Sequence, residues 1–152
     1  MNITVSKIGT VLSLLLLMGL FSTVTAQETN TATPGIDFHH GTFAEAKAKA
    51  AEEKKVIFVD AYAQWCRPCR WMAANTFTDG KIGNYFNQHF ISMKLDMEKG
   101  EGPKLARGWG IRAYPTLLFF DANGKEIHRD MGAKEVDQLM SLGKKVVKKK
   151  KS

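Results

Sequence analysis

The only two cysteines of the chain, Cys66 and Cys69, stand three positions apart, shortly after the apolar run VIFVDAY at residues 56–62. That run is nearly continuous in β-branched and aromatic residues, which is typical of a strand buried on both faces in a parallel sheet. A strand that leads straight into a helix places Cys66 at the helix N-terminus and Cys69 one turn later. Pro68 fits this arrangement because a proline in the first turn of a helix loses no backbone hydrogen bond. The segment predicts a strand–helix unit with the cysteine pair at its junction.

Patterns on both sides of this unit predict an α/β domain with a central mixed β-sheet flanked by helices. The first helix begins with Thr42 and Glu45 in the spacing of a capping box. An Asp-Ala-Asn-Gly turn separates an apolar run from a mixed one and predicts a β-hairpin. The expected elements are helices at residues 42–55, 66–77, 81–90, 101–110 and 133–147, strands at 56–62 and 91–97, and the hairpin at 116–132.

The first 26 residues have the pattern of an export signal. Lys7 is followed by an apolar stretch at residues 8–21, and small residues at Val24 and Ala26 predict cleavage after Ala26. The stretch is shorter than the roughly 20 residues of a membrane span, although an uncleaved anchor stays an alternative if the next four residues are included. No cysteine adjoins the cleavage site, which excludes a lipoprotein. We therefore expect a periplasmic protein, in which a cysteine pair can persist as a disulfide.

The remaining chain divides into a flexible linker at residues 27–37, a domain at 38–147 and a basic tail at 148–152. The formal net charge of +7 comes from the two ends of the chain, because Lys7 and six lysines among the last nine residues account for all of it. Such a tail is typical of a solvated chain end, and contact with anionic lipid or an acidic partner is the alternative. Nothing in the charge distribution of the domain supports binding of nucleic acid.

The cysteine pair has several possible chemistries. A structural zinc site needs four ligands, and the four histidines of the chain lack the spacing of a second zinc-binding pair. Covalent haem attachment needs a histidine at position 70, which is an arginine. A purely structural disulfide fits poorly because so short a loop constrains little of the unfolded chain. Redox chemistry fits best, since a helix N-terminus and the positive charge of Arg67 both stabilise a thiolate at Cys66.

Two segments carry a resemblance to a known family. VDAYAQWCRPCR at residues 59–70 resembles the active-site segment of thioredoxin, and WGIRAYPTLLFF at residues 109–120 resembles the stretch with its cis-proline. The similarity covers roughly residues 56–132. The chain particularly resembles the periplasmic thioredoxin-like domains, above all the C-terminal domain of the thiol:disulfide interchange protein DsbD. That group shares the TFTD break at residues 76–79 and the FFDANGKE hairpin.

The resemblance implies roles for the residues that react. Cys66 matches the exposed attacking cysteine and Cys69 the buried resolving one. Asp60 matches a buried carboxylate that relays the proton of the resolving cysteine, and burial in an apolar strand should raise its pKa. Lys94 matches a lysine near that acid. The alternatives are an Asp60 that reaches solvent at the strand end and a Lys94 that is an ordinary exposed lysine.

The resemblance also implies a substrate-binding surface. Trp65 matches the tryptophan that flanks the pair and contacts partners. Pro115 matches the cis-proline, which keeps metal away from the thiols and lets the backbone of Tyr114 pair with an extended substrate segment. Tyr62 stands where thioredoxin has a second tryptophan, and core packing is expected for it.

The chain departs from thioredoxin at three positions. Ala74 replaces the proline that kinks the active-site helix, Arg67 replaces a glycine between the cysteines, and Trp71 replaces a smaller residue. Because the residues between the cysteines influence the redox potential, Arg67 leaves the direction of electron flow open. We expect it to make the pair more oxidising than cytoplasmic thioredoxin.

Together these features predict a thiol–disulfide oxidoreductase, more a reductase than an oxidase, without a cofactor or a metal. Its expected partners are disulfide-bonded proteins and a membrane or periplasmic thiol–disulfide electron donor, and we expect a monomer. The alternative from another class is a non-catalytic thioredoxin-fold module that binds peptides as a chaperone.

Overall fold

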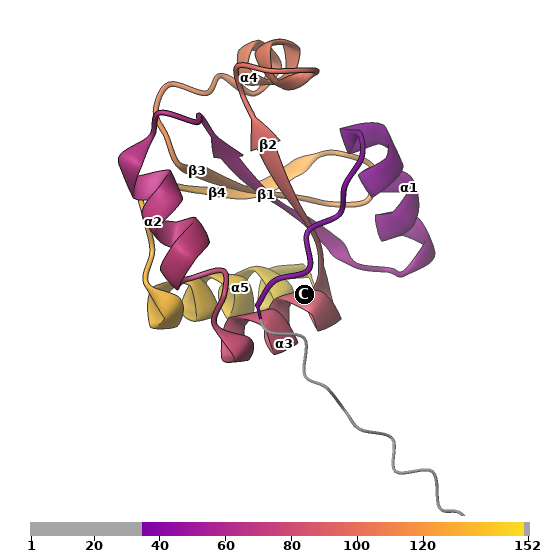
Figure 1. The fold of residues 1–152 in the computed structure, drawn as a ribbon. Coiled ribbons are helices and arrows are strands. Elements are labelled where there is room, and N and C mark those ends of the chain that lie inside the picture. Colours follow the sequence, from indigo (N-terminus) through magenta and orange to yellow (C-terminus); the bar gives the residue numbers. More distant parts are fainter. Residues whose placement is uncertain (1–34, 151–152) are drawn as a thin grey trace, which may run out of the picture. The chain divides into compact units, whose positions relative to one another are not determined.

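The computed structural model describes residues 35–150, in which a four-stranded sheet is flanked by five helices (Figure 1). The strand order is β2-β1-β3-β4. The elements in chain order are α1 (Phe43–Glu52), β1 (Val56–Tyr62), α2 (Arg67–Asn75), α3 (Gly80–His89), β2 (Phe90–Asp96), α4 (Gly102–Trp109), β3 (Thr116–Phe120), β4 (Glu126–Met131) and α5 (Val136–Lys150). The predicted fold class is confirmed.

β1 is a central strand, as its continuous apolar sequence predicts. It pairs in parallel with β2 and antiparallel with β3, so the sheet is mixed. In this register Asp60 lies opposite Lys94 on β2 and Leu117 on β3. β3 and β4 form the predicted hairpin.

The two faces of the sheet carry separate hydrophobic clusters, because successive side chains of a strand point to opposite faces. Ile57, Val59 and Ala61 of β1 pack in a cluster that includes residues of α1 and α4. Val56 and Phe58 pack in the other cluster, with residues of α2, α3 and α5. The alternation places the side chain of Asp60 on the second face, the one that α2 covers.

Helix starts are fixed by side chains that cap the free backbone N–H groups. Thr42 and Glu45 form the predicted capping box at α1, with Glu45 N donating to Thr42 Oγ1 at 3.2 Å and Thr42 N donating to Glu45 Oε2 at 2.6 Å. Asp79 begins α3 by accepting from the N–H groups of Lys81 and Ile82 at 2.8 and 3.2 Å. The predicted break between α2 and α3 is therefore present.

The ordered chain extends further at both ends than the sequence suggests. The backbone N–H of Ile36 donates to Phe77 O at 2.7 Å, so residues assigned to the flexible linker are already fixed before Phe38. The lysines assigned to a tail at Lys148 continue as helix, because α5 runs to Lys150. The predicted export signal lies outside the described residues. Among the helices within residues 35–150, none combines the length and the apolar character needed to cross a membrane.

Candidate active site

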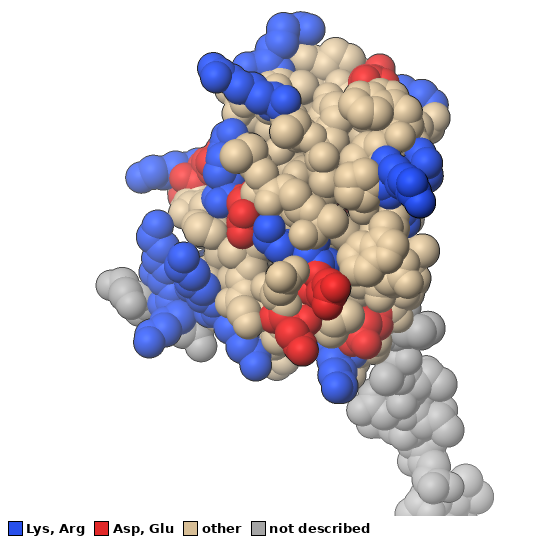
Figure 2. All heavy atoms as spheres, turned by 90° about the vertical axis from the view of Figure 1, so that its left-hand side faces the viewer, with Lys and Arg blue, Asp and Glu red and all other residues tan. Residues whose placement is uncertain are grey.

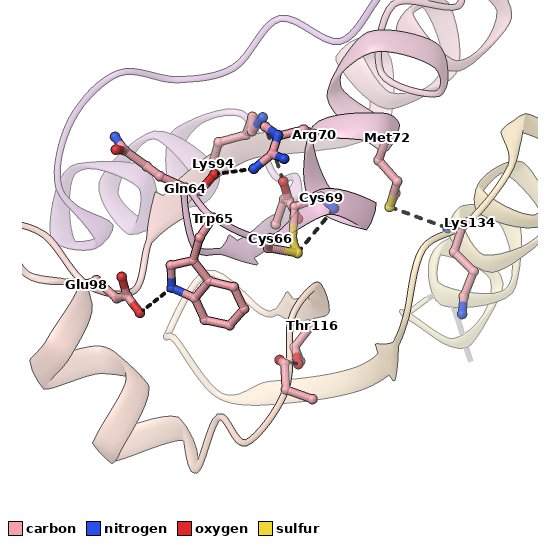
Figure 3. The surroundings of a disulfide bond; sticks show 12 residues. Gln64, Trp65, Cys66, Cys69, Arg70, Met72, Lys94, Glu98, Thr116 and Lys134 are labelled. Atoms are coloured by element: carbon pink, nitrogen blue, oxygen red, sulfur yellow. Dashed lines mark hydrogen bonds and ion pairs between the residues drawn. A yellow bond between two sulfur atoms is a disulfide. The ribbon is translucent and has the colours of Figure 1, made fainter.

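Cys66 and Cys69 form a disulfide at the N-terminus of α2 (Figure 3). Cys66 is the N-cap residue, and its Sγ accepts a hydrogen bond from Cys69 N at 3.2 Å. Pro68 lies in the first turn, where its missing N–H leaves no partner unsatisfied. After reduction, a thiolate at Cys66 would face the free N–H groups and the positive end of the helix dipole, which stabilise the charge.

Both cysteines are buried, with exposed fractions of 3% for Cys66 and 2% for Cys69. They pack with Ala63, and Tyr62 and Tyr114 lie against this small cluster. The expectation of an exposed Cys66 is therefore wrong for the disulfide form, because the tyrosines cover the pair and the Cys66 sulfur is bonded to Cys69. A partner must reach a sulfur that is almost covered.

Trp65 is the most exposed aromatic residue next to the disulfide, with 66% of its surface exposed. Its indole Nε1 donates to Glu98 Oε1 at 2.8 Å, and its ring lies edge-on to Tyr114 at a centroid distance of 5.8 Å. Figure 3 shows the indole alongside the disulfide, on the side toward Glu98. Glu98 follows β2 in a loop, and no sequence pattern singled it out. This contact holds the tryptophan in place while leaving most of its surface free.

The loop before β3 lies beside the same cluster. The Tyr114–Pro115 peptide bond is cis. Thr116 Oγ1 donates to Ala113 O at 2.7 Å, and Gly132 N donates to Pro115 O at 2.9 Å. These bonds tie the proline loop to itself and to the end of β4.

Asp60 is fully buried on the face of β1 that α2 covers. Neither of its carboxylate oxygens accepts a hydrogen bond from the described part of the chain. Burial raises the pKa of Asp60 to about 7, and Lys94 opposes that rise. The Lys94 Nζ lies 4.0 Å from Asp60 Oδ2. A carboxyl group of this kind can gain or lose a proton near neutral pH.

Comparisons with known proteins agree with this geometry. The sequence model of a family described as thioredoxin-like matches residues 37–122. The chain belongs to the thioredoxin-like family. It is 31% identical over 123 residues to the thiol:disulfide interchange protein DsbD of Tatumella citrea, which covers 74% of this chain and 21% of that protein. It is also 33% identical over 98 residues to the thioredoxin-like protein slr0233 of Synechocystis, covering 64% of this chain and 88% of that one.

Solved structures show the same likeness. A candidate disulphide-isomerase from Bacteroides thetaiotaomicron is 41% identical, with a TM-score of 0.67 and coverage of 76% of this chain and 95% of that one. The C-terminal domain of DsbD from Neisseria meningitidis is 20% identical with a TM-score of 0.56, which supports the fold alone. The chain spans about a fifth of the length of the Tatumella DsbD. It thus carries the Cys66–Cys69 pair within a thioredoxin-like domain.

In this thioredoxin-like protein the ammonium of Lys94 lies among three aromatic rings. Its Nζ is 4.9 Å from the ring centroid of Tyr62, 5.5 Å from that of Phe77 and 5.9 Å from that of Phe38. Such cation–π contacts are worth about 0.5–1 kcal/mol each at exposed sites and more when desolvated. An open hollow of about 480 Å³, lined in part by Phe38, Tyr62 and Lys94, borders the ammonium. We call Phe38, Tyr62 and Phe77 the lysine cage.

The lysine cage was not foreseen from the sequence. Tyr62 was expected to serve core packing, whereas it contacts both Lys94 and the disulfide cluster. Phe38 precedes α1 and Phe77 follows α2, so the three rings come from separate segments and share no local pattern. Pairing of Phe38 with Ser92 at the edge of β2 is what brings the first ring to the site.

The positions at which the chain departs from thioredoxin all lie on α2. Arg67 is exposed at the first position of the helix, and Trp71 and Ala74 are also exposed. Arg70 Nη1 donates to Gln64 O at 2.8 Å and so ties the helix to the loop before the disulfide. The three large apolar side chains that are exposed within the described residues are Trp65, Trp71 and Met131. Figure 2 shows the face that carries α2, where uncharged residues form a broad area bordered by charged ones.

Proposed function

We propose that the chain is an exported thiol–disulfide oxidoreductase that reduces disulfides of partner proteins through Cys66 and Cys69. The observation that carries this proposal is the position of Cys66, which caps α2 and accepts the Cys69 N–H while bonded to Cys69. The match to the thioredoxin-like family supports the class of chemistry.

The reaction begins from the reduced pair. The Cys66 thiolate attacks one sulfur of a partner disulfide, forms a mixed disulfide and releases the other partner sulfur as a thiolate. The Cys69 thiol then loses its proton, and its thiolate attacks Cys66 Sγ. This step forms the Cys66–Cys69 disulfide and releases the second partner thiolate. The partner gains two electrons, and the released thiolates take up two protons.

Asp60 is the proposed acceptor of the Cys69 proton. It is buried on the face of β1 that α2 covers, and its pKa of about 7 suits a base that works near neutral pH. Lys94 keeps the carboxylate form accessible despite burial, since an ammonium at 4.0 Å offsets part of the desolvation. The lysine cage holds that ammonium in position.

Partner binding is assigned to Trp65 together with the backbone of Tyr114 and Pro115. The exposed indole offers apolar surface next to the disulfide, and the loop before β3 offers backbone groups to an extended segment. Substrates of this kind are extended stretches around a disulfide-bonded cysteine.

The direction of electron flow is proposed from the residues between the cysteines. Pro68 keeps the dipeptide pattern of thioredoxin, which favours reduction of partners. Arg67 adds a positive charge one residue after Cys66 and stabilises the thiolate form, so the potential should be less negative than the −270 mV of thioredoxin. A measured potential equal to or more negative than that value would contradict this role of Arg67.

Export and the source of electrons complete the proposal. The pattern of the first 26 residues supports export with cleavage after Ala26. The chain has two cysteines and hence no second pair to reduce its disulfide. We infer that a membrane or periplasmic thiol protein of the DsbD kind supplies the electrons.

The test is reduction of insulin by dithiothreitol with the wild-type chain and two matched variants. Cys66→Ser should lose all catalysed turnover, because the attacking sulfur is absent. Cys69→Ser should also lose turnover. When it is reduced beforehand and freed of dithiothreitol, it should accumulate a mixed disulfide with insulin, visible on non-reducing gels. Activity that survives Cys66→Ser would overturn the mechanism. Binding of reduced insulin that is equal in all three proteins, without turnover in any, would favour the peptide-binding module.

A further inference from the structure

The distal half of α5 carries a concentrated positive charge that the redox chemistry does not use. Every ionisable residue after Asp137 is a lysine. Lys144, Lys145, Lys148 and Lys149 are exposed and follow one another at i, i+1, i+4 and i+5, so they share one side of α5, next to the side that buries Leu142 and Val146. We call these four residues the lysine face. Figure 2 shows a dense group of Lys and Arg side chains at the lower left of the face that it draws.

The lysine face contains more charge than the helix needs. Cations stabilise the C-terminal end of a helix only within its last turn, and Lys144 and Lys145 lie before that turn. Lysines four apart repel one another, which disfavours the helix. A solvated chain end also does not need to be fixed, yet Lys149 Nζ donates to Ile127 O at 3.2 Å and Lys150 Nζ to Lys54 O at 2.6 Å. Lys149 of the lysine face and the neighbouring Lys150 are thus fixed against β4 and against the segment before β1.

The field of the lysine face extends to β4. The pKa of His128 is lowered, first by burial and then by Lys145, with Lys149 adding to the effect. Asp130 and Glu126 act in the opposite direction, but Glu126 pairs with Arg129 and Asp130 with Lys134. The charges of Lys145 and Lys149 therefore reach a side chain of β4.

We infer that the lysine face docks the protein on a membrane surface that contains anionic lipids. Lysine ammonium groups spread over about two helical turns suit a diffuse layer of lipid phosphates. Each lysine near such a surface should increase the affinity for the membrane roughly fivefold. Arginine would be expected for bidentate recognition of particular phosphates, and aromatic residues for stacking on nucleic-acid bases; the four residues are all lysines. The inference goes beyond the proposed redox function and does not depend on it.

The position of the lysine face agrees with this use. α5 begins near α2, where Thr76 Oγ1 donates to Lys134 O, and it ends at Lys54, shortly before β1 begins. The disulfide follows the opposite end of β1. Seven residues at about 3.3 Å each make this strand roughly 20 Å long, so the strand separates the disulfide from the end of α5 by about that distance. A protein attached through the lysine face would keep its disulfide free for partners.

The test is binding to lipid vesicles. It uses the protein as purified from the cells that express it, without further trimming. Sedimentation with vesicles of phosphatidylcholine, with and without phosphatidylglycerol, gives the affinity ratio between the two lipids at low and high salt. An apolar N-terminal stretch would bind both kinds of vesicle alike, so the ratio reports charge alone. The wild type should prefer phosphatidylglycerol, and salt should abolish the preference.

Two variants with the same charge separate the lysine face from net charge. Substitution of Lys144, Lys145, Lys148 and Lys149 by glutamine should reduce phosphatidylglycerol binding roughly a hundredfold or more. Substitution of the exposed Lys81, Lys99, Lys104 and Lys125 by glutamine should keep most of it. Urea unfolding checks that both variants fold. Equal losses in both, no preference in the wild type, or tighter binding to polyglutamate or duplex DNA than to the vesicles would overturn the inference.

Discussion

The two faces of β1 carry side chains of different kinds. Toward α1 and α4 the strand presents Ile57, Val59 and Ala61, all buried and apolar. Toward α2 it presents Val56 and Phe58 and then Asp60, a carboxyl group without a hydrogen-bond partner in the described chain. The first face contributes only packing, whereas the second carries an acid two residues before the end of the strand that leads to the disulfide.

The second face therefore contains a group that destabilises the folded chain, and the first face does not. A buried carboxylate without hydrogen bonds costs several kcal/mol unless it is paired or protonated. On the second face the cost is reduced by Lys94 and by protonation near neutral pH. On the first face the side chains of β1 are apolar and carry no such cost. Substitutions that move the carboxylate, remove it or change the charge beside it test this difference between the two faces.

Moving a carboxylate to the first face should have the largest effect. Val59 is fully buried between Met93 and Leu118 in the sheet register. Val59→Asp should lower the free energy of unfolding at pH 7 by about 3–5 kcal/mol, since the new charge has no partner. Val59→Ala, which only removes packing, should lose less. Urea denaturation that shows Val59→Asp no less stable than Val59→Ala would contradict the distinction between the faces.

Removing the acid should change how stability depends on pH. Because burial raises the pKa of Asp60 to about 7 from an ordinary value of 3.8, the folded chain binds this proton more tightly than the unfolded chain. The stability contribution of Asp60 therefore falls as pH rises between these two values. Relative to Asp60→Asn, the wild type should lose about 2–3 kcal/mol of unfolding free energy from pH 5 to pH 8. Parallel curves for the two proteins would mean that Asp60 titrates normally.

Removing the cation should shift the pH dependence of catalysis. Lys94→Met should raise the pKa of Asp60 further, by roughly one unit, because the opposing charge is lost. The pH midpoint of insulin reduction should rise with it. Lys99→Met, in the exposed loop after β2, is the matched control and should leave the midpoint in place. A midpoint that is unchanged in Lys94→Met would remove this lysine from the mechanism.

Loosening the lysine cage should have the smallest effect. Phe77→Leu removes one ring from the ammonium, a loss of about 0.5–1 kcal/mol, and should raise the pH midpoint by a few tenths of a unit. Phe86→Leu alters the same hydrophobic cluster but removes none of the three rings around Lys94, so it should lower stability similarly and leave the midpoint unchanged. Equal midpoints in the two variants would show that the cage only packs.

Much of the fold follows from local sequence patterns. The apolar run of β1, the Thr42–Glu45 capping box and the turn of the β3–β4 hairpin each depend on neighbouring residues, and the structure contains all three. Cys66 as the N-cap of α2 is likewise local, since it follows from a strand that runs into a helix.

The rest depends on contacts between distant segments. Burial of Cys66 depends on Tyr114, which comes from the loop before β3. The lysine cage needs Phe38 beside β2 and Phe77 beyond the end of α2. The early start of the ordered chain depends on the bond from Ile36 to Phe77. None of these contacts leaves a periodic or motif-like trace in the sequence.

The central claim is that the exceptional residue on the second face of β1 is an acid poised for proton transfer. A ¹³C NMR titration of the Asp60 carboxyl carbon in the disulfide form, assigned by its loss in Asp60→Asn, tests it directly. We predict a midpoint near pH 7, the value to which burial raises this pKa. A midpoint near the ordinary value of 3.8 would contradict the account.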